Sequence, residues 1–440
     1  MLNMAQGRPG TWLRHCIAGS EDLPNVISAR EIVDAESRFT RFAPLLATLF
    51  AGEQGAGWDG LVRSPLISFP AENGALALVK ADNDLAPTGS VKARGGMHEL
   101  LWLVERTGLE QGLITPASDY SVLLGDDATT LFSRQRVVVA STGNLGFSIG
   151  RIARAFGMTA EIHMSREAKA WKKEQLLALG ADVIVHDGDY SETVAAARAA
   201  ARAAGSHFVD DERSRLLLAG YACAAAELRD QLMELGVAVG RERPILVYIP
   251  CGVGGAPGGI TRGLKALFGA GAVCVFVEPV GSACVTAALA AGGTPSVYAC
   301  GGDTVSIADG LAVPRASELV MAAVGNAIDA AVTVTDAEMI EWVGRVWDCA
   351  GIKLEPSAAA AFAAHGRLIE AAATLGRPLP VDAVPVFWCT GGGRMPEKEF
   401  EELLSLGRGG SPAGNAVTRR LPSGKGNFAD QFRPSSRGSS

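Results

Sequence analysis

The sequence predicts an α/β protein with at least two domains. Its 440 residues exceed the roughly 250 to 300 residues at which a single hydrophobic core stops growing. Hydrophobic residues make up 48% and charged residues 20% of the chain, an ordinary balance for a globular protein. From residue 137 onward, short β-branched runs alternate with helical stretches. This alternation is typical of parallel sheets that are covered by helices.

The alternation is clearest between residues 137 and 212. The predicted strands are VVVAST, TAEIHM, ADVIVHD and HFVDD, and the predicted helices between them are GNLGFSIGRIARAFG, AKAWKKEQLLALG and SETVAAARAAARAAG. These segments make three complete strand–helix units between longer flanking regions. We therefore expect residues 137–212 to form a smaller inserted α/β domain, and residues 1–136 and 213–406 to form one larger, discontinuous domain.

The same pattern resumes after residue 212 and predicts a second sheet. A helical stretch, LLLAGYACAAAELRDQLMELG, precedes the strand ILVYIP, a glycine loop, the helix ITRGLKALFG and the strand AVCVFVEP. A helix-rich region that includes SAAAAFAAHGRLIEAAATLG leads to a last strand, AVPVFWC. Residues 407–440 are rich in Gly, Ser and Arg, and we expect them to form a disordered tail.

Composition and charge exclude several classes of partner. The formal net charge is -7 and there is no long Lys/Arg run, so we expect no nucleic-acid partner. The uncharged stretches near 244–260 and 279–302 are broken by Gly and Pro, so neither predicts a membrane span. The eight cysteines are scattered without a CxxC pair, and the N-terminus lacks an apolar signal region. We therefore expect reduced thiols and a cytoplasmic protein.

A glycine-rich loop, CGVGGAPGG, follows the strand ILVYIP at residues 251–259 and precedes a helix. Glycines allow backbone N–H groups to approach a phosphate closely, and the N-terminus of the helix adds partial positive charge. The loop lacks the Lys-Ser/Thr ending of a Walker A motif, and its spacing departs from G-x-G-x-x-G. Two interpretations stay open: a phosphate-binding loop, or a turn that packs the strand against the helix.

Two further loops also follow predicted strands. In STGNLG, Ser141, Thr142 and the N–H groups that enter the helix can hold a carboxylate, and Asn144 offers an amide that can bond a ring hydroxyl. Simple capping of the helix is the alternative. In CTGGG, Thr390 offers a neutral hydroxyl to a ligand, whereas the alternative is an ordinary strand end.

The stretch LAPTGSVKARGG contains Lys92. Most lysines are solvated surface charges. Here a Pro-Thr-Gly turn precedes the lysine and an apolar helical stripe begins at Val91. A lysine that is partly withdrawn from water at such a helix start has an amine that can form a Schiff base.

Taken together and in order, these four signals resemble a known family. Ser-x-Lys-x-Arg-Gly-Gly, Ser-Thr-Gly-Asn, Gly-Val-Gly-Gly and Thr-Gly-Gly-Gly are similar to the motifs of the fold type II (tryptophan synthase β-like) pyridoxal phosphate enzymes. Within that family the chain resembles the bacterial D-serine dehydratases, or D-serine ammonia-lyases. The resemblance spans roughly residues 30–405. It includes the segments HMSREAKAWKKEQL, DDERSRLLLAGY, ADGLAVPRAS and LEPSA.

The resemblance implies a fold and an activity. The fold is two open α/β domains with pyridoxal 5′-phosphate in the cleft between them, and the activity is removal of water from D-serine to give pyruvate and ammonia. We expect a monomer, with a homodimer as the alternative. Because Thr88, Ala256 and Arg394 depart from the family pattern, D-threonine, L-threonine and L-serine stay open as substrates.

Three other functions compete with the dehydratase. A β-replacement enzyme shares the fold type II fold, so the motifs alone do not separate it from a dehydratase. A non-catalytic protein that binds a small ligand stays open as well. A nicotinamide oxidoreductase is disfavoured, because no acidic residue follows a proper G-x-G-x-x-G by about 20 positions.

The resemblance also implies roles for individual residues. Lys92 forms the Schiff base with the cofactor aldehyde and later removes the Cα proton of the substrate. The glycine loop binds the phosphate, while an amide bonds the ring hydroxyl and a hydroxyl faces the ring nitrogen. The residues implied to bind the cofactor are Lys92, Asn144, Gly252, Val253, Gly254, Gly255 and Thr390.

A second set of residues is implied to act on the substrate. Ser90 lies beside the lysine, and Ser141, Thr142 and Gly143 take the substrate carboxylate. The resemblance further implies a monovalent cation, potassium, near Glu278.

Overall fold

The computed structural model describes residues 6–55, 57–70, 76–141, 143–166 and 168–408. A seven-stranded sheet has the order β1-β10-β9-β8-β11-β3-β2. Its inner neighbours, from β10 to β3, are parallel, whereas β1 and β2 are antiparallel to the strands beside them. Its strands are β1 (Thr11–Leu13), β2 (Leu66–Pro70), β3 (Leu76–Lys80), β8 (Ile245–Pro250), β9 (Ala272–Pro279), β10 (Ala330–Val334) and β11 (Val384–Trp388).

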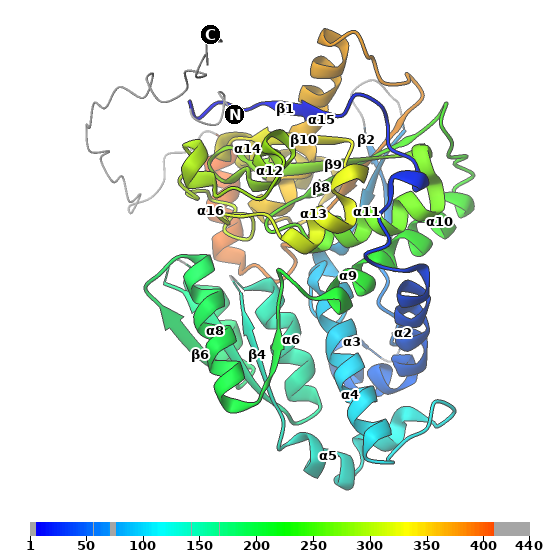
Figure 1. Cartoon of the computed structure of the whole chain (residues 1–440), viewed down its shortest axis with the longest axis vertical. Coiled ribbons are helices and arrows are strands. Elements are labelled where there is room, and N and C mark those ends of the chain that lie inside the picture. The colour runs from blue at the N-terminus through cyan, green and yellow to red at the C-terminus, as the bar shows by residue number, and fades with distance from the viewer. Residues whose placement is uncertain (1–5, 56, 71–75, 142, 167, 409–440) are drawn as a thin grey trace, which may run out of the picture.

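A four-stranded parallel sheet has the order β6-β5-β4-β7. Figure 1 shows β4 and β6 in the lower half of the molecule and β8, β9 and β10 in the upper half. Its strands are β4 (Arg136–Ala140), β5 (Thr159–Ser165), β6 (Asp182–His186) and β7 (His207–Val209). The residue limits of the two domains stay a prediction.

Helices cover both sheets, and helix α15 packs across β8, β9, β10 and β11 of the larger one. In the smaller sheet, α6 and α8 pack on β4 and β5. The helices that accompany the smaller sheet are α6 (Asn144–Ala155), α7 (Ala170–Ala178) and α8 (Tyr190–Ala204). The other helices are α2 (Ala29–Leu49), α3 (Ala51–Gln54), α4 (His98–Glu110), α5 (Asp126–Phe132), α9 (Arg215–Ala222), α10 (Ala224–Glu234), α11 (Gly255–Phe268), α12 (Cys284–Ala291), α13 (Glu318–Val324), α14 (Asp336–Ala350), α15 (Pro356–Thr374) and α16 (Glu397–Gly407).

Shorter helical turns connect these elements. A π-helical turn, η3 (Ala93–Met97), starts directly after Lys92 and continues into α4. The 3-10 turns are η1 (Ser20–Asp22), η2 (Asp82–Asp84), η4 (Tyr120–Leu124), η5 (Gly269–Gly271), η6 (Val280–Ser282), η7 (Val297–Cys300) and η8 (Gly325–Ala327).

The predicted strands from 137 onward are all present, with every residue of β8, β9 and β11 buried. Continuous burial is expected of parallel strands with helices on both faces. Four strands were not predicted: β1, β2, β3 and β10. Two of them, β1 and β2, are antiparallel edge strands, and neither contains a buried residue. They therefore lack the continuous burial that marks the inner strands β8, β9 and β11.

One predicted helix is divided. The sequence predicts a single helix over residues 216–236, but α9 ends at Ala222 and α10 begins at Ala224. At Cys223 the backbone N–H bonds to Tyr221 O, which is a tighter turn than an α-helix makes.

The last helix of the described chain, α16, reaches the start of the predicted tail. The predicted tail lies outside the described residues from 409 onward, while α16 extends to Gly407. Every helix in the described ranges is too short or too polar to cross a lipid bilayer.

Candidate active site

Four loops that carry the predicted residues meet at one place. Ser141 follows β4, Gly252 follows β8 and Thr390 follows β11, so three parallel strands present their carboxyl ends to a common cleft. The Lys92 segment joins them because Val91 N donates to Thr390 O at 2.9 Å. An isolated bridge between Ser90 and Gly391 continues this contact.

These loops enclose a pocket. Of the predicted residues, it brings together Lys92, Ser141, Asn144, Gly252, Val253, Gly254, Gly255 and Thr390. It is also lined by residues to which the sequence assigned no role, namely Tyr190, Asp211, Gly310, Leu311, Glu355 and Ser357.

Lys92 extends into this pocket from the start of η3. Its Nζ lies 3.7 Å from Asp211 Oδ2 and 5.7 Å from the centroid of the Tyr221 ring. The side chain keeps 21% of its surface exposed. The amine is therefore open to the pocket and has a carboxylate within reach.

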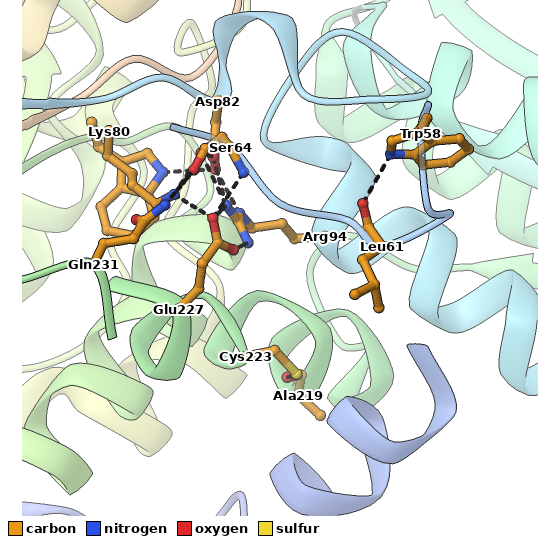
Figure 2. A network of polar contacts seen from close by, with 11 residues as sticks. Trp58, Leu61, Ser64, Lys80, Asp82, Arg94, Ala219, Cys223, Glu227 and Gln231 are labelled. Atoms are coloured by element: carbon orange, nitrogen blue, oxygen red, sulfur yellow. Dashed lines mark hydrogen bonds and ion pairs between the residues drawn. The ribbon is translucent and has the colours of Figure 1, made fainter. Parts of the chain in front are cut away.

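Below Lys92 lies a buried group of charged residues that we call the anchor network. It consists of Ser64, Lys80, Asp82, Arg94, Glu227 and Trp388. The Arg94 guanidinium donates to both carboxylate oxygens of Asp82 at 2.7 Å and to Glu227 Oε2 at 2.7 Å. Lys80 pairs with Glu227 and donates to Ser64 O at 2.6 Å. Figure 2 shows these side chains converging from separate segments of the chain.

The anchor network contains two positive and two negative side chains, and the attraction between them shifts the pKa values of its two acids. Burial alone would raise the pKa of the Asp82 carboxyl, but the charge and hydrogen bonds of Arg94 hold it below its usual value. The same opposition lowers the pKa of Glu227. Both acids therefore stay ionised at neutral pH.

The anchor network fixes two loops of the pocket at once. Arg94 is two residues after Lys92, and Trp388 is two residues before Thr390. Trp388 Nε1 donates to Asp82 Oδ2 at 2.8 Å, so the same carboxylate that binds Arg94 also binds the last strand. Asp82 thereby sets the position of Lys92 relative to Thr390.

The glycine loop after β8 fits a phosphate group. Gly254 has φ +102° and caps the N-terminus of α11, a helix of 14 residues. A Cβ at Gly252 would lie 2.9 Å from Gly310 O, so only glycine leaves this space open. The hydroxyl of Ser357 is buried and has no partner among the described residues, although it lines the pocket. The loop can hold a phosphate, and the pocket contains an unpaired polar group that a cofactor can meet.

The loop after β4 begins as a helix cap. Ser141 Oγ accepts hydrogen bonds from Gly143 N at 3.0 Å and from Gly146 N at 2.8 Å. Gly143 has φ +146° and is the N-cap of α6. Thr142 lies outside the described residues. The capping interpretation of Ser141 is therefore correct, and the same side chain also lines the pocket.

A second group of charged residues, which we call the pocket network, spans the cleft. It consists of Asn144, Lys172, Asp309, Glu355 and Arg394. Lys172 Nζ lies 2.9 Å from Asp309 Oδ1 and 3.5 Å from Glu355 Oε2. Asn144 Nδ2 donates to Glu355 Oε1 at 2.7 Å, and Arg394 Nη2 donates to Asn144 Oδ1 at 2.9 Å.

Lys172, the lysine of the pocket network, is a charged side chain that is almost completely buried. Burial alone would lower the pKa of Lys172, but the charges of Asp309 and Glu355 raise it above its usual value. Lys172 lies on α7, beside the smaller sheet, whereas Asp309 lies in the segment between β9 and β10 and Glu355 is the N-cap of α15, between β10 and β11 of the larger sheet. The pocket network therefore joins the two sheets through ion pairs.

Three predicted residues among those the structure describes, Ser90, Gly143 and Glu278, do not line the pocket. Ser90 is fully buried, and its hydroxyl has no hydrogen-bond partner among the described residues. Glu278 accepts hydrogen bonds from Val285 N at 2.7 Å and Thr286 N at 2.8 Å, and burial raises its pKa to about 7. No cluster of three or more His, Cys, Asp or Glu side chains in the described ranges could hold a metal ion. The cation site near Glu278 stays a prediction.

The residues that sequence reasoning missed lie in segments that already carried the resemblance. Lys172 is in HMSREAKAWKKEQL, Asp211 is in DDERSRLLLAGY, Asp309 is in ADGLAVPRAS and Glu355 is in LEPSA. These segments were a usable signal for their importance. The sequence did not reveal the roles of these four residues, because none of them lies beside one of the four motifs that were assigned to the cofactor or the substrate.

Comparison with known proteins defines the class. The family model described as "Pyridoxal-phosphate dependent enzyme" matches residues 54–378, which is most of the chain. Solved structures agree on the fold. Diaminopropionate ammonia lyase from Escherichia coli in its holo form gives a TM-score of 0.72 at 19% identity and covers 91% of this chain and 98% of that one. A fungal L-serine ammonia-lyase from Rhizomucor miehei gives a TM-score of 0.60 at 21% identity, with 78% and 97% covered. The predicted fold type II class is confirmed.

Relatives of higher identity define the family more narrowly. The chain is 45% identical over 393 residues to a probable D-serine dehydratase of Burkholderia lata, covering 85% of this chain and 87% of the relative. It is 43% identical over 418 residues to that of Acidovorax ebreus, with 90% and 91% covered. It is 40% identical over 409 residues to the D-serine dehydratase of Salmonella arizonae, with 88% and 92% covered. The chain belongs to the D-serine dehydratase family of the pyridoxal-phosphate dependent enzymes.

Proposed function

We propose that this protein is a D-serine ammonia-lyase that uses pyridoxal 5′-phosphate to eliminate water from D-serine. The observation that carries the proposal is the match, at 40–46% identity over most of the chain, to relatives named D-serine dehydratase. It is supported by a pocket that is lined by both Lys92 and the glycine loop that we propose to bind phosphate.

When bound, the cofactor supplies an electron-accepting ring that stabilises negative charge at the substrate Cα. The protein groups that would hold it are the N–H groups of the glycine loop, the Asn144 amide and the Thr390 hydroxyl. Thr390 carries no charge, so it leaves the ring nitrogen unprotonated and the ring a moderate electron acceptor. That suits an elimination, because the charge at Cα passes directly to the breaking C–O bond.

Lys92 has two tasks in this proposal. It holds the cofactor through its amine, and once the substrate amine has displaced it, Nζ accepts the Cα proton. Asp211, whose Oδ2 lies 3.7 Å from Nζ, stabilises the ammonium that results. In the balance of the reaction, the Cα proton and the Cβ hydroxyl leave together as one water, which returns Lys92 to its free amine, and the enamine that is released takes up water to give pyruvate and ammonia.

The substrate carboxylate would bind at the N-terminus of α6. Gly143 is the N-cap of this helix and Ser141 lies two residues before it, where backbone N–H groups and the helix dipole favour an anion. Thr142 belongs to the proposed carboxylate site but lies outside the described residues. With the carboxylate fixed there and Lys92 on one face, the orientation of the Cα proton selects the D enantiomer.

We also propose a compartment, an oligomeric state, a cation and an alternative substrate for this enzyme. The enzyme would act in the cytoplasm as a monomer, with its eight cysteines as free thiols. Potassium near Glu278 would increase its activity, and D-threonine is the alternative substrate because Thr88 and Arg394 depart from the family pattern.

The test is pyruvate release from D-serine by the purified protein in the presence of pyridoxal phosphate, with and without potassium. L-serine, D-threonine and L-threonine are assayed in parallel. Lys92→Ala should lower turnover by at least about 1,000-fold while thermal unfolding stays nearly unchanged. Lys353→Ala removes a lysine with the same exposed fraction as Lys92, 21%, that pairs with Glu397 outside the pocket, and serves as the control. A colourless protein that binds no cofactor, or full activity in Lys92→Ala, would contradict the proposal.

A further inference from the structure

Asn144 lies between a group that only donates hydrogen bonds and a group that only accepts them. The Arg394 guanidinium has no acceptor atom, so the atom of Asn144 that faces it at 2.9 Å must be the amide oxygen. The Glu355 carboxylate has no donor when ionised, so the atom that faces it at 2.7 Å must be the amide nitrogen. These two neighbours fix which way the amide of Asn144 points.

Three glycines of the sequence motifs make room for this arrangement. A Cβ at Gly89 would lie 2.6 Å from Arg394 Cγ, and a Cβ at Gly391 would lie 2.4 Å from Glu355 Oε1. A Cβ at Gly143 would lie 2.4 Å from Lys172 Cδ. Real side chains do not approach this closely. Each of these motif glycines therefore leaves space for a member of the pocket network.

Arg394 is itself held firmly. Its guanidinium lies 3.6 Å from the centroid of the Phe147 ring, and Nη1 donates to Gln175 Oε1 at 2.8 Å. Gln175 Nε2 in turn donates to Arg394 O at 3.0 Å. Burial lowers the pKa of Arg394 to about 10, so the guanidinium stays charged at neutral pH and keeps its donor character.

We propose that Arg394 is a positioning residue for the cofactor and that it acts through Asn144. Because its guanidinium only donates hydrogen bonds, Arg394 holds the amide oxygen of Asn144 and, together with Glu355, keeps the amide from turning over. Nδ2 therefore stays on the side of Glu355, which lines the pocket. One N–H of Nδ2 is taken by Glu355, and the second donates to the ring hydroxyl of pyridoxal phosphate. This inference rests on the proposed function and adds a residue that does not line the pocket itself.

Turning the Asn144 amide over would weaken cofactor binding. The amide would then present its oxygen, which cannot donate, so the hydrogen bond from Nδ2 to the ring oxygen would be lost. A hydrogen bond of this kind changes a dissociation constant by about five- to tenfold. Arg394→Met keeps the length and apolar stem of the side chain but removes its donors, so it should weaken cofactor binding by this factor.

The experiment measures the dissociation constant of pyridoxal phosphate by equilibrium dialysis, together with the visible absorption of the bound cofactor. The proteins are wild type, Arg394→Met, Asn144→Ala and the double variant. Arg394→Met and Asn144→Ala should each raise the dissociation constant about five- to tenfold, and the double variant should be no weaker than Asn144→Ala alone. Arg367→Met removes another arginine in an ion pair, with Glu338, and should leave cofactor binding unchanged.

A second variant covers the case in which Arg394→Met fails to fold. Arg394→Lys retains the positive charge and a donor for the amide oxygen, so it should bind the cofactor more tightly than Asn144→Ala does. Additive effects in the double variant, or unchanged binding in Arg394→Met while Asn144→Ala is weakened, would overturn the inference. Unchanged binding in Asn144→Ala would overturn it as well. Failure of the wild-type protein to bind the cofactor would instead overturn the proposed function.

Discussion

The anchor network and the pocket network are both buried groups of opposite charges. The first lies around the larger sheet alone, whereas the second joins residues beside both sheets. The anchor network joins Lys80, Asp82, Arg94 and Glu227, and two acids balance two bases within the part of the chain that surrounds the larger sheet. The pocket network instead joins Lys172 on α7 to carboxylates in segments that connect strands of the larger sheet. One network stabilises a single unit, and the other connects two.

The difference shows how one protein uses buried charge for two purposes. In the anchor network both carboxylate oxygens of Asp82 are bonded by Arg94, and none of its members lines the pocket, so it acts on the pocket only by holding the Lys92 and Thr390 segments. In the pocket network Asn144 and Glu355 line the cavity, so their hydrogen bonds also determine what a ligand meets. We infer that the first network contributes mainly to stability and the second mainly to activity, because only the second borders the reacting groups.

The largest expected effect tests the anchor network. Asp82→Ala leaves two buried cations opposite one carboxylate, so we expect the free energy of unfolding to fall by about 3–5 kcal/mol. Urea unfolding followed by circular dichroism measures this loss. Asp59→Ala removes an exposed partner of Arg63 and should cost less than about 1 kcal/mol. Equal losses in the two variants would show that the anchor network does not carry the stability assigned to it.

Lys172→Met tests the pocket network. We expect a smaller loss of about 2 kcal/mol, since Asp309 stays partly accessible to water, but a fall of about 100-fold in kcat/KM for D-serine because Asn144 and Glu355 shift. Lys173→Met changes the next residue, whose amine only donates to Arg166 O, and serves as the control. Normal kcat/KM in Lys172→Met would contradict the assignment of this network to activity.

Acid should weaken the anchor network selectively. The folded-state pKa values of Asp82 and Glu227 lie below their unfolded values of about 3.9 and 4.3. Their contribution is therefore complete above those values and is lost as the pH falls through the folded-state pKa values. The unfolding free energy measured from about pH 6 to about pH 3 should fall more steeply for wild type and Lys172→Met than for Asp82→Ala. The same slope in all three proteins would exclude Asp82 as the source.

The smallest effects concern two glycines with the same substitution. Gly391→Ala places a Cβ 2.4 Å from Glu355 Oε1 and should lower kcat/KM about tenfold by displacing the carboxylate from Asn144. Gly366→Ala, within α15, meets no atom within 4 Å and should stabilise the protein by about 0.5–1 kcal/mol without changing kcat/KM. Equal kcat/KM values in the two variants would show that the close approach of Glu355 to Gly391 does not affect activity.

The fold could be predicted where strand and helix alternate regularly, and less well elsewhere. The strands β4 to β9 and β11 were visible as apolar runs beside helical stretches. The edge strand β1 was not, because its pairing depends on a partner far away in the sequence, as Thr11 with Val332 shows.

The site could be predicted to the extent that its residues lie in motifs. Lys92, Asn144, the glycine loop and Thr390 were identified from local chemistry and their order, and they do line one pocket. Glu355 and Lys172 were missed because their importance arises from a contact between residues that lie far apart in the chain. A lysine next to Trp171 on an ordinary helix carries no sign that it is buried.

By itself, the sequence determined which loops follow strands, which of them contain glycine, and which lysine precedes a helix. These properties depend on neighbouring residues, since backbone conformation and helix starts are local. Only the tertiary structure decided that Gly89, Gly143 and Gly391 make room for Arg394, Lys172 and Glu355. The physical reason is that steric space and ion pairing depend on distances through space, and folding sets those distances between segments that the sequence keeps apart.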